Sequence, residues 1–147
     1  MECEFFLFWE LFRCQAISAG IKTIEKEYPN VHGCVLKSSN PSIFCAGLDL
    51  MELHQPSEER LPQFWNAVQQ VYLDVYGSRL AVIGAIEGHA PAAGCMLALC
   101  CDYRIMTSSS KATIGFNETK LGRFSIINIQ SFSKIIFFNT VTLMYNE

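Results

Sequence analysis

The sequence predicts an α/β fold, and two observations support this prediction. Short segments rich in β-branched and apolar residues alternate with segments in which apolar residues recur every three or four positions. The first pattern is typical of strands and the second of amphipathic helices. Turns of small residues connect some of these strands to the helices that follow them. Strands that alternate with helices form βαβ units, from which α/β domains are built.

The composition fits one globular domain and excludes several classes of function. The chain has 147 residues, of which 50% are hydrophobic and 17% are charged. The net charge of −3 is small and lysines and arginines do not cluster, so we expect no nucleic-acid partner. No segment has the ~18 consecutive apolar residues of a membrane span, so none is expected.

The cysteines indicate a reducing compartment. Seven cysteines occur without a Cys-x-x-Cys pair, and several lie within apolar runs such as 99–101. Thiols used in this way act as small buried apolar side chains, and we interpret Cys45 in the same sense. His32, His54 and His89 have no ligand spacing to the cysteines, so we expect no metal site.

The first half of the chain is expected to begin with a helix, or two, over residues 5–26. A strand is expected over 31–37, followed by a loop over 38–42. A short helical segment is expected at 49–54, and the polar stretch 55–60 is expected on the surface. In this helical segment Phe8, Leu11 and Phe12 are expected to share a face, and Ile17, Ile21 and Ile24 continue the spacing after a slip near Gly20.

The second half is expected to begin with an amphipathic helix over residues 62–76. The segment 80–86 is apolar on both sides of its pleat, which predicts a strand buried on both faces. Residues 92–101 are small and apolar, as in a helix that is buried all round. Short strands are expected at 102–106 and 112–115. The apolar stripe of the amphipathic helix, which we interpret as core packing, consists of Phe64, Val68, Val71, Tyr72 and Val75.

The last 25 residues differ in character from the rest. Residues 125–145 are rich in Ile, Phe, Asn, Thr and Ser, contain no Gly or Pro, and carry a single charge, that of Lys134. They fit neither the helical nor the strand period and have the composition of an aggregation-prone β segment.

Two turns of small residues are the candidate functional elements. They are residues 44–50 (FCAGLDL) and residues 88–95 (GHAPAAGC), and each follows an apolar run and precedes a helix start. Backbone N–H groups at a helix start lack an intrahelical partner, and small side chains let a ligand approach them. Two such turns can direct two N–H groups at one oxygen, which is the plan of an oxyanion hole. The alternative is two ordinary strand-to-helix turns.

Four motifs in order resemble the crotonase, or enoyl-CoA hydratase/isomerase, superfamily. They are the two turns, residues 101–105 (CDYRI) and residues 114–122 (IGFNETKLG). The resemblance covers residues 31–122 and is strongest to the mitochondrial isomerases of that superfamily. It implies a partial crotonase-like spiral of ββα units, preceded by a helical segment over 1–30 and followed by an atypical tail over 123–147.

The resemblance implies a role for each matching position. Ala46 and Ala93 match the residues whose backbone N–H groups form the oxyanion hole, although the family usually has glycine at the second position. Glu118 matches the catalytic carboxylate. Contacts with the substrate are implied for Ala46, Gly47, Leu48, Asp49, Leu50, Ala93 and Asn117.

These roles imply an isomerase of fatty acid β-oxidation that moves a double bond of an enoyl-CoA from position 3 to position 2. The substrate would be an acyl-CoA, and no cofactor is implied. Apolar groups of Ile114, Phe116 and Leu121 are expected to surround Glu118 and raise its pKa toward neutrality. A hydratase is the alternative, but the second acid that hydration needs is replaced here by Met96.

Other interpretations of the same residues stay open. Glu118 can also be interpreted as a glutamate on the surface and Asp49 as the cap of the short helix after the first turn. His89 can be interpreted as a turn residue without a role in catalysis. The resemblance implies a homotrimer in the mitochondrial matrix, but neither a transit peptide nor the strand pair that precedes the first helix in the family is evident. After Gly122 the sequence departs from the family, which predicts a truncated chain. A non-catalytic fragment that folds only with a partner is therefore a further alternative.

Overall fold

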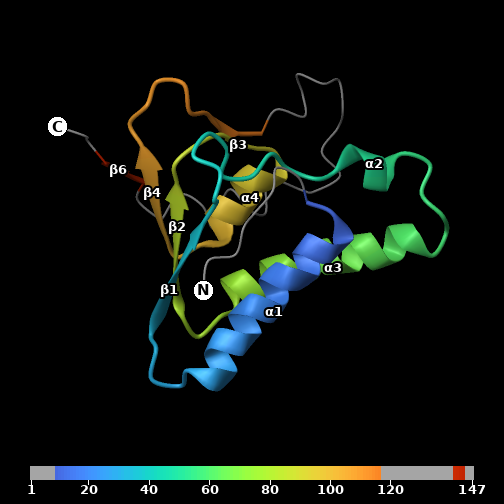
Figure 1. Cartoon of the computed structure of the whole chain (residues 1–147), viewed down its shortest axis with the longest axis horizontal. Helices are drawn as coiled ribbons and strands as arrows, with labels where there is room; N and C mark the ends of the chain where they lie inside the picture. Colours follow the sequence, from blue (N-terminus) through green and yellow to red (C-terminus); the bar gives the residue numbers. More distant parts are fainter. Residues whose placement is uncertain (1–8, 117–140, 145–147) are drawn as a thin grey trace.

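The computed structural model describes residues 9–116 and 141–144, which form a layer of strands and a layer of helices (Figure 1). This arrangement confirms the α/β class. In chain order the elements are α1 (Leu11–Glu27), β1 (Gly33–Lys37), α2 (Leu50–Leu53), α3 (Arg60–Tyr76), β2 (Ala81–Ile86), β3 (Ala90–Pro91), α4 (Ala93–Cys100), β4 (Tyr103–Thr107), β5 (Ile114–Gly115) and β6 (Val141–Met144).

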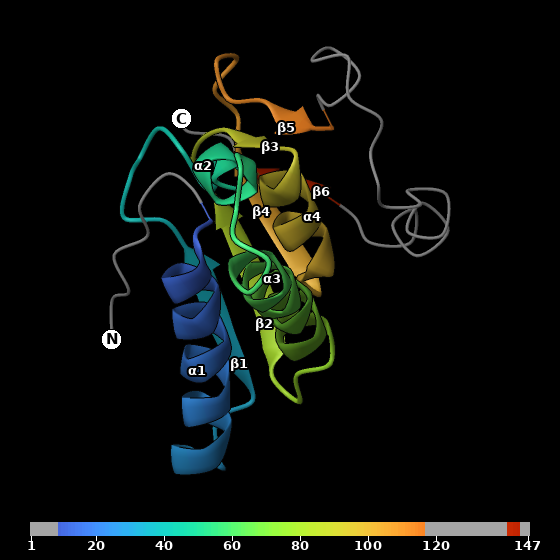
Figure 2. The same cartoon turned by 90° about the vertical axis from the view of Figure 1, so that its right-hand side faces the viewer.

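The main sheet has the strand order β1-β2-β4-β6, and every neighbouring pair is parallel. Val35 of β1 is in register with Ile83 of β2, which is in register with Tyr103 of β4. A second, two-stranded parallel sheet joins β3 to β5. The helices lie on one face of the main sheet, as the two perpendicular views show (Figures 1 and 2).

The helices α1 and α3 pack against each other, and both contribute buried side chains to the core. The predicted stripe of the second helix is confirmed, because Phe64, Val68, Val71 and Val75 are buried. The predicted face of the first helix is wrong at Phe12, whose exposed fraction is 76%. Phe12 follows Leu11 by one position, about 100° around the helix, so the two cannot share a narrow stripe. The buried residues of α1 are Leu11, Cys14, Ile17, Ser18 and Ile21.

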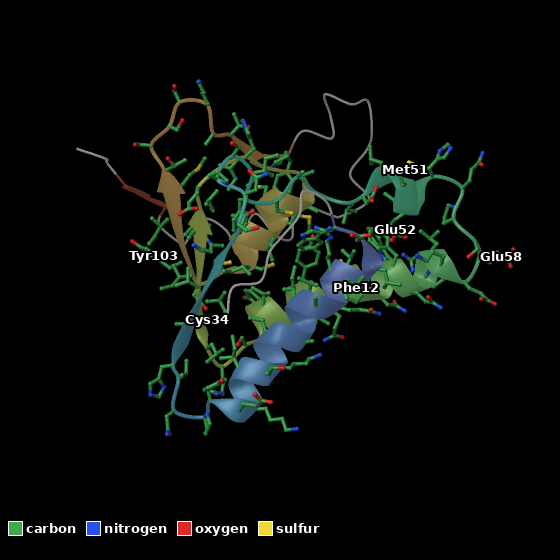
Figure 3. All side chains as sticks on the ribbon, in the orientation of Figure 1. Phe12, Cys34, Met51, Glu52, Glu58 and Tyr103 are labelled. Carbon is green, nitrogen blue, oxygen red and sulfur yellow. The ribbon has the colours of Figure 1, made fainter. Side chains whose placement is uncertain are left out.

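The expectation that residues 80–86 are buried on both faces of the sheet is only half correct. Val82, Gly84 and Ile86 are buried, but Ala81 is exposed and the residues between them are half-buried. The helices of the described part cover one face only, and the other face presents Val35 and Tyr103, with exposed fractions of 60% and 39%. In Figure 3 the Tyr103 side chain lies on the side of the sheet away from the helices.

The helix α4 confirms the prediction of a small-residue helix that is buried all round, since all of its residues except Leu99 are buried. Five of the six described cysteines are also buried, and none forms a disulfide with another described residue. Burial raises the pKa of the Cys14, Cys45, Cys100 and Cys101 thiols to about 12, so these thiols are unreactive near neutral pH.

Membrane-spanning helices and metal-ligand clusters are both absent from residues 9–116 and 141–144. Within these residues, no helix is long and apolar enough to cross a membrane. The same part of the chain contains no group of three or more potential metal ligands. The predicted tail over 123–147 lies mostly outside the described residues, and its described part forms β6 beside β4.

The C-terminal end of α1 is tied to the loop before β2 by Glu25 and Arg79. The Glu25 carboxylate accepts hydrogen bonds from the Ser78 hydroxyl at 2.7 Å and from the Arg79 backbone N–H at 3.0 Å. The Arg79 guanidinium donates to the backbone carbonyls of Glu25, Tyr28 and Val31 at 2.8–3.1 Å. The Ser78 hydroxyl and the Arg79 N–H hold the pKa of Glu25 below its ordinary value.

This lowered pKa predicts an acid-dependent loss of stability. The ionised Glu25 stabilises the fold above the ordinary glutamate pKa of about 4.3, and the contribution disappears as the pH falls through that value and then through the lower native pKa. In E25Q the free energy of unfolding, measured by urea titration, should therefore fall less between pH 6 and pH 3 than in the parent. The matched control is E27Q at the exposed end of the same helix. Parallel pH profiles of the parent and E25Q would contradict the prediction.

Candidate active site

The first turn is fixed on one side by the second. The backbone N–H groups of Phe44 and Cys45 both donate to the carbonyl of His89, at 2.9 and 3.2 Å, and the N–H of His89 donates to the Ser42 carbonyl at 2.9 Å. Ile43 and His89 thus form a parallel bridge. The strand-like segment that enters the first turn therefore runs beside the start of the second.

On its other side, the first turn is fixed by Trp9. The Trp9 N–H donates to the Gly47 carbonyl at 2.8 Å, and the Asp49 N–H donates to the Trp9 carbonyl at 2.9 Å. The Trp9 side chain is buried, and its ring lies 5.4 Å from the ring of Tyr72 between centroids. Trp9 places the backbone of the first turn against the core, a role that sequence reasoning missed.

The second turn passes through a strained residue into α4. The Ala90 and Ala92 N–H groups donate to the carbonyls of Thr113 and Gly115, at 2.8 and 2.9 Å. Ala92 has φ +50° and ψ −121°, a backbone conformation that is unfavourable for a residue with a Cβ. The reversal places Ala93 at the first position of α4.

The two turns lie in direct contact. A Cβ added to Gly94 would meet the carbonyl oxygen of Cys45 at 2.1 Å, so α4 can approach the first turn only with glycine at this position. Gly47 has φ +101°, and a Cβ added there would lie 3.6 Å from the backbone nitrogen of Ala93. The two segments that the sequence identifies as turns of small residues are therefore in contact in the structure.

Two backbone N–H groups at this contact have no acceptor in the described part of the chain. They belong to Ala46, which is half-buried, and to Ala93, which is buried. The Ala93 N–H lies at the N-terminal end of α4, where the helix dipole favours negative charge. An oxygen that carries developing negative charge is the ligand that such donors suit.

The end of the first turn and the helix α2 are held by hydrogen bonds within the described chain. The Asp49 carboxylate accepts from the Met51 N–H at 2.8 Å and caps α2, as the capping interpretation expects. Glu52 fixes α2, because its carboxylate accepts from the Leu11 N–H at 3.2 Å and from the Arg60 side chain at 2.8 Å. Leu50 and Met51 are exposed.

The predicted carboxylate and its neighbours lie beyond β5. Asn117, Glu118 and Leu121 fall outside the described residues, so their roles stay predictions. Of the apolar residues expected around Glu118, Phe116 is half-buried and Ile114 has an exposed fraction of 37%. Ile114 pairs with Ala90 in the two-stranded sheet.

Met96 is the residue that the family resemblance aligns with the second acid of a hydratase. Its side chain is buried, and the Tyr72 hydroxyl lies 3.9 Å from its sulfur. Desolvation raises the pKa of Tyr72, so its hydroxyl stays protonated near neutral pH. The Met96 thioether thus lies beside the neutral Tyr72 phenol, and neither group can activate water as a carboxylate does.

His89 acts in the turn through its backbone and its ring. Its Nδ1 lies 2.9 Å from the Thr113 hydroxyl and accepts from the Thr113 N–H at 3.3 Å. These contacts connect the second turn to the loop before β5. The position agrees with the interpretation of His89 as a turn residue.

A large groove in the described part of the chain lies away from the turns. It has a volume of about 720 Å³ and lies between α1 and β1, and none of its lining residues belongs to 44–50 or to 88–95. A small cavity of about 10 Å³ lies behind the first turn, lined in part by Trp9, Cys45 and Leu97. The candidate site is therefore defined by the contact of the two turns and not by an enclosed pocket.

The parallel sheet with helices on one face, and with two turns in contact at its edge, defines an α/β protein with a candidate anion-binding site made of backbone N–H groups. Residues 15–145 match the family described as enoyl-CoA hydratase/isomerase, and the chain belongs to that family. The resemblance inferred from the four motifs is thereby confirmed.

Individual relatives support the same family. The chain is 50% identical over 93 residues to the mitochondrial enoyl-CoA delta isomerase 1 of Rattus norvegicus, an alignment that covers 63% of this chain and 32% of the rat protein. It is 38% identical over 96 residues to the mitochondrial methylglutaconyl-CoA hydratase of Homo sapiens, covering 65% of this chain and 28% of that protein.

The fold is similar to that of a solved relative. The crystal structure of human mitochondrial delta3-delta2-enoyl-CoA isomerase superposes with a TM-score of 0.80 and 34% identity, covering 86% of this chain and 49% of that one. The chain thus spans about a third of the length of the curated relatives it matches and about half of this solved structure. A partial crotonase fold, as expected from the sequence, is confirmed.

The contact between the turns predicts a sharp difference between two glycines. G94A should lower the free energy of unfolding by about 3 kcal/mol, because the added methyl group would overlap the Cys45 carbonyl. G20A, in the middle of α1 where an added Cβ would meet nothing within 4 Å, should raise it by about 0.5–1 kcal/mol. Urea unfolding followed by circular dichroism measures both, and equal stability of the two variants would refute the described contact.

Proposed function

We propose that this chain carries the active site of an isomerase that converts a 3-enoyl-CoA to a 2-enoyl-CoA. The observation that carries the proposal is the contact of the two turns. It joins the two segments that carry the N–H groups of Ala46 and Ala93, which lack acceptors among the described residues. The relatives named enoyl-CoA delta isomerase, which are 45–50% identical, support the same reaction.

The reaction requires stabilisation of an enolate. A base removes a proton from C2, and the electron pair of the broken C–H bond delocalises onto the thioester oxygen to give a dienolate. When the carbonyl re-forms, the double bond lies between C2 and C3, and the electrons of the former C3–C4 double bond take up a proton at C4. Negative charge develops on the thioester oxygen, where the Ala46 and Ala93 N–H groups would donate hydrogen bonds. A donor of this kind contributes on the order of 10²–10³ in rate. Both are backbone groups, so alanine in place of glycine at position 93 keeps the donor.

Glu118 is the residue we assign to proton transfer. The carboxylate would take the C2 proton and deliver it to C4, so a single residue is sufficient and no cofactor is needed. Substrate contacts are proposed for residues 46–50, Ala93 and Asn117. The exposed Leu50 side chain, at the end of the first turn, would offer an apolar surface to the acyl-CoA.

A hydratase is the second candidate, because a methylglutaconyl-CoA hydratase is among the relatives. The buried Met96, with the Tyr72 hydroxyl near its sulfur, argues against it, since hydration needs a second carboxylate. We also propose, from the names of the relatives, that the protein acts in fatty acid metabolism in mitochondria. A homotrimer is proposed on the family resemblance alone.

The decisive variant is E118Q. Glutamine cannot transfer the proton, so the rate of conversion of 3-enoyl-CoA to 2-enoyl-CoA should fall by at least about a hundredfold. General acid–base catalysis accelerates a reaction by about 10²–10⁴. Conversion is followed spectrophotometrically, with thermal unfolding as the check on folding. The matched control is E58Q in the exposed loop before α3, at the end of the molecule away from the sheet (Figure 3). Unchanged turnover in E118Q would remove Glu118 from the mechanism, and a folded parent without turnover would favour the non-catalytic alternative.

A further inference from the structure

A buried arginine holds the far end of the helix that begins at Ala93. Arg104 lies on β4, and its exposed fraction is 1%. It is the largest of the fully buried side chains in the described chain. Its Nη1 donates to the backbone carbonyls of Ala98 at 3.3 Å and of Cys101 at 2.8 Å. Both carbonyls belong to the last turn and C-cap of α4.

The Cys101 carbonyl is a group that the helix end leaves without an intrahelical partner, whereas the Ala98 carbonyl also accepts from the Cys101 N–H at 3.3 Å. The C-terminal end of a helix also carries partial negative charge, which a cation neutralises. Burial of a guanidinium is unfavourable unless its N–H groups find acceptors. Two of the acceptors of the Arg104 guanidinium come from the end of α4, so the position of this side chain in the core and the position of the helix end depend on each other.

The attachment continues into the central strand. Arg104 is in register with Gly84 of β2. The Val82 N–H donates to the carboxylate of the nearby Asp102 at 2.8 Å, and the Asp102 N–H donates to the Val82 carbonyl at 2.9 Å. Asp102 thus fixes the chain between α4 and β4 to the sheet, while Arg104 fixes α4 itself.

We propose that Arg104 is a positioning residue that holds the Ala93 N–H in line with the thioester oxygen, an inference that rests on the proposed function. The helix α4 has eight residues and so a length of about 12 Å, too short to bend appreciably between its ends. A shift of its C-terminal end therefore moves its N-terminal amide. Displacements of about 1 Å in such a site can reduce the rate about a hundredfold.

The test compares R104M, R104K and the control D102N in the full chain. D102N disturbs the same segment through β2 without removing a donor to α4. The probe is a 2-enoyl-CoA with a ¹³C-labelled thioester carbonyl, whose stretching frequency is read by infrared difference spectroscopy on binding. A well-placed oxyanion hole polarises this carbonyl and lowers its stretching frequency. This frequency does not depend on the overall stability of the protein.

We expect the downshift to be largest in the parent, intermediate in R104K and at least halved in R104M, with D102N like the parent. The kcat for isomerisation should fall at least tenfold in R104M while KM changes less than threefold. A parental downshift in R104M would overturn the positioning role. Should R104M fail to fold, R104K decides, because a lysine reaches the carbonyls without the planar fork of arginine, and a parental downshift there would also overturn the role.

The same measurement separates this inference from the proposed function. A parent chain that binds the probe without any downshift would refute the oxyanion hole, and with it the role of Arg104. A downshift in the parent that is equal in all variants would leave the oxyanion hole standing and refute the positioning role alone.

Discussion

The contact between Gly94 and the carbonyl of Cys45 is the constraint on which the rest of the site depends. It joins two backbone segments that are about 50 residues apart without an intervening side chain. The surrounding interactions hold these segments in place. Trp9 and the His89 carbonyl fix the first turn, the two-stranded sheet fixes the second, and Arg104 fixes the helix that follows it. The catalytic geometry we propose is therefore a property of main-chain packing.

Much of the fold could be predicted because the positions of several helices and strands follow from local patterns of apolar and small residues. The spacing of apolar residues placed α3 within two residues of its observed start, and the run of small apolar residues identified α4 as a fully buried helix. The patterns failed where burial depends on what lies across an interface. Phe12 is as apolar as Leu11 yet points to solvent, and the outer face of β2 is as apolar as its inner face yet is not covered by the helices described.

The site was predictable in a different sense. The two turns could be recognised because glycine and alanine, gathered where a strand gives way to a helix, indicate a close approach of the main chain, and the family motifs order them along the chain. The roles of Trp9, Tyr72 and Arg104 could not be recognised, because each depends on a partner distant in sequence or on burial that no local pattern records. An aromatic side chain in an apolar stripe indicates core packing, and nothing local reveals that the Tyr72 hydroxyl lies beside the Met96 sulfur.

The strained Ala92 has a consequence for how freely this turn can vary. Residue 92 would accept glycine with relief of its unfavourable φ, and residue 93 contributes through an atom that every amino acid except proline possesses. Residue 94 accepts nothing larger than glycine. Three adjacent positions thus differ widely in their tolerance to substitution, and the strictest of them contributes no atom to the proposed chemistry. In a collection of variants, an invariant glycine beside changeable neighbours would mark a packing constraint and not a chemical one.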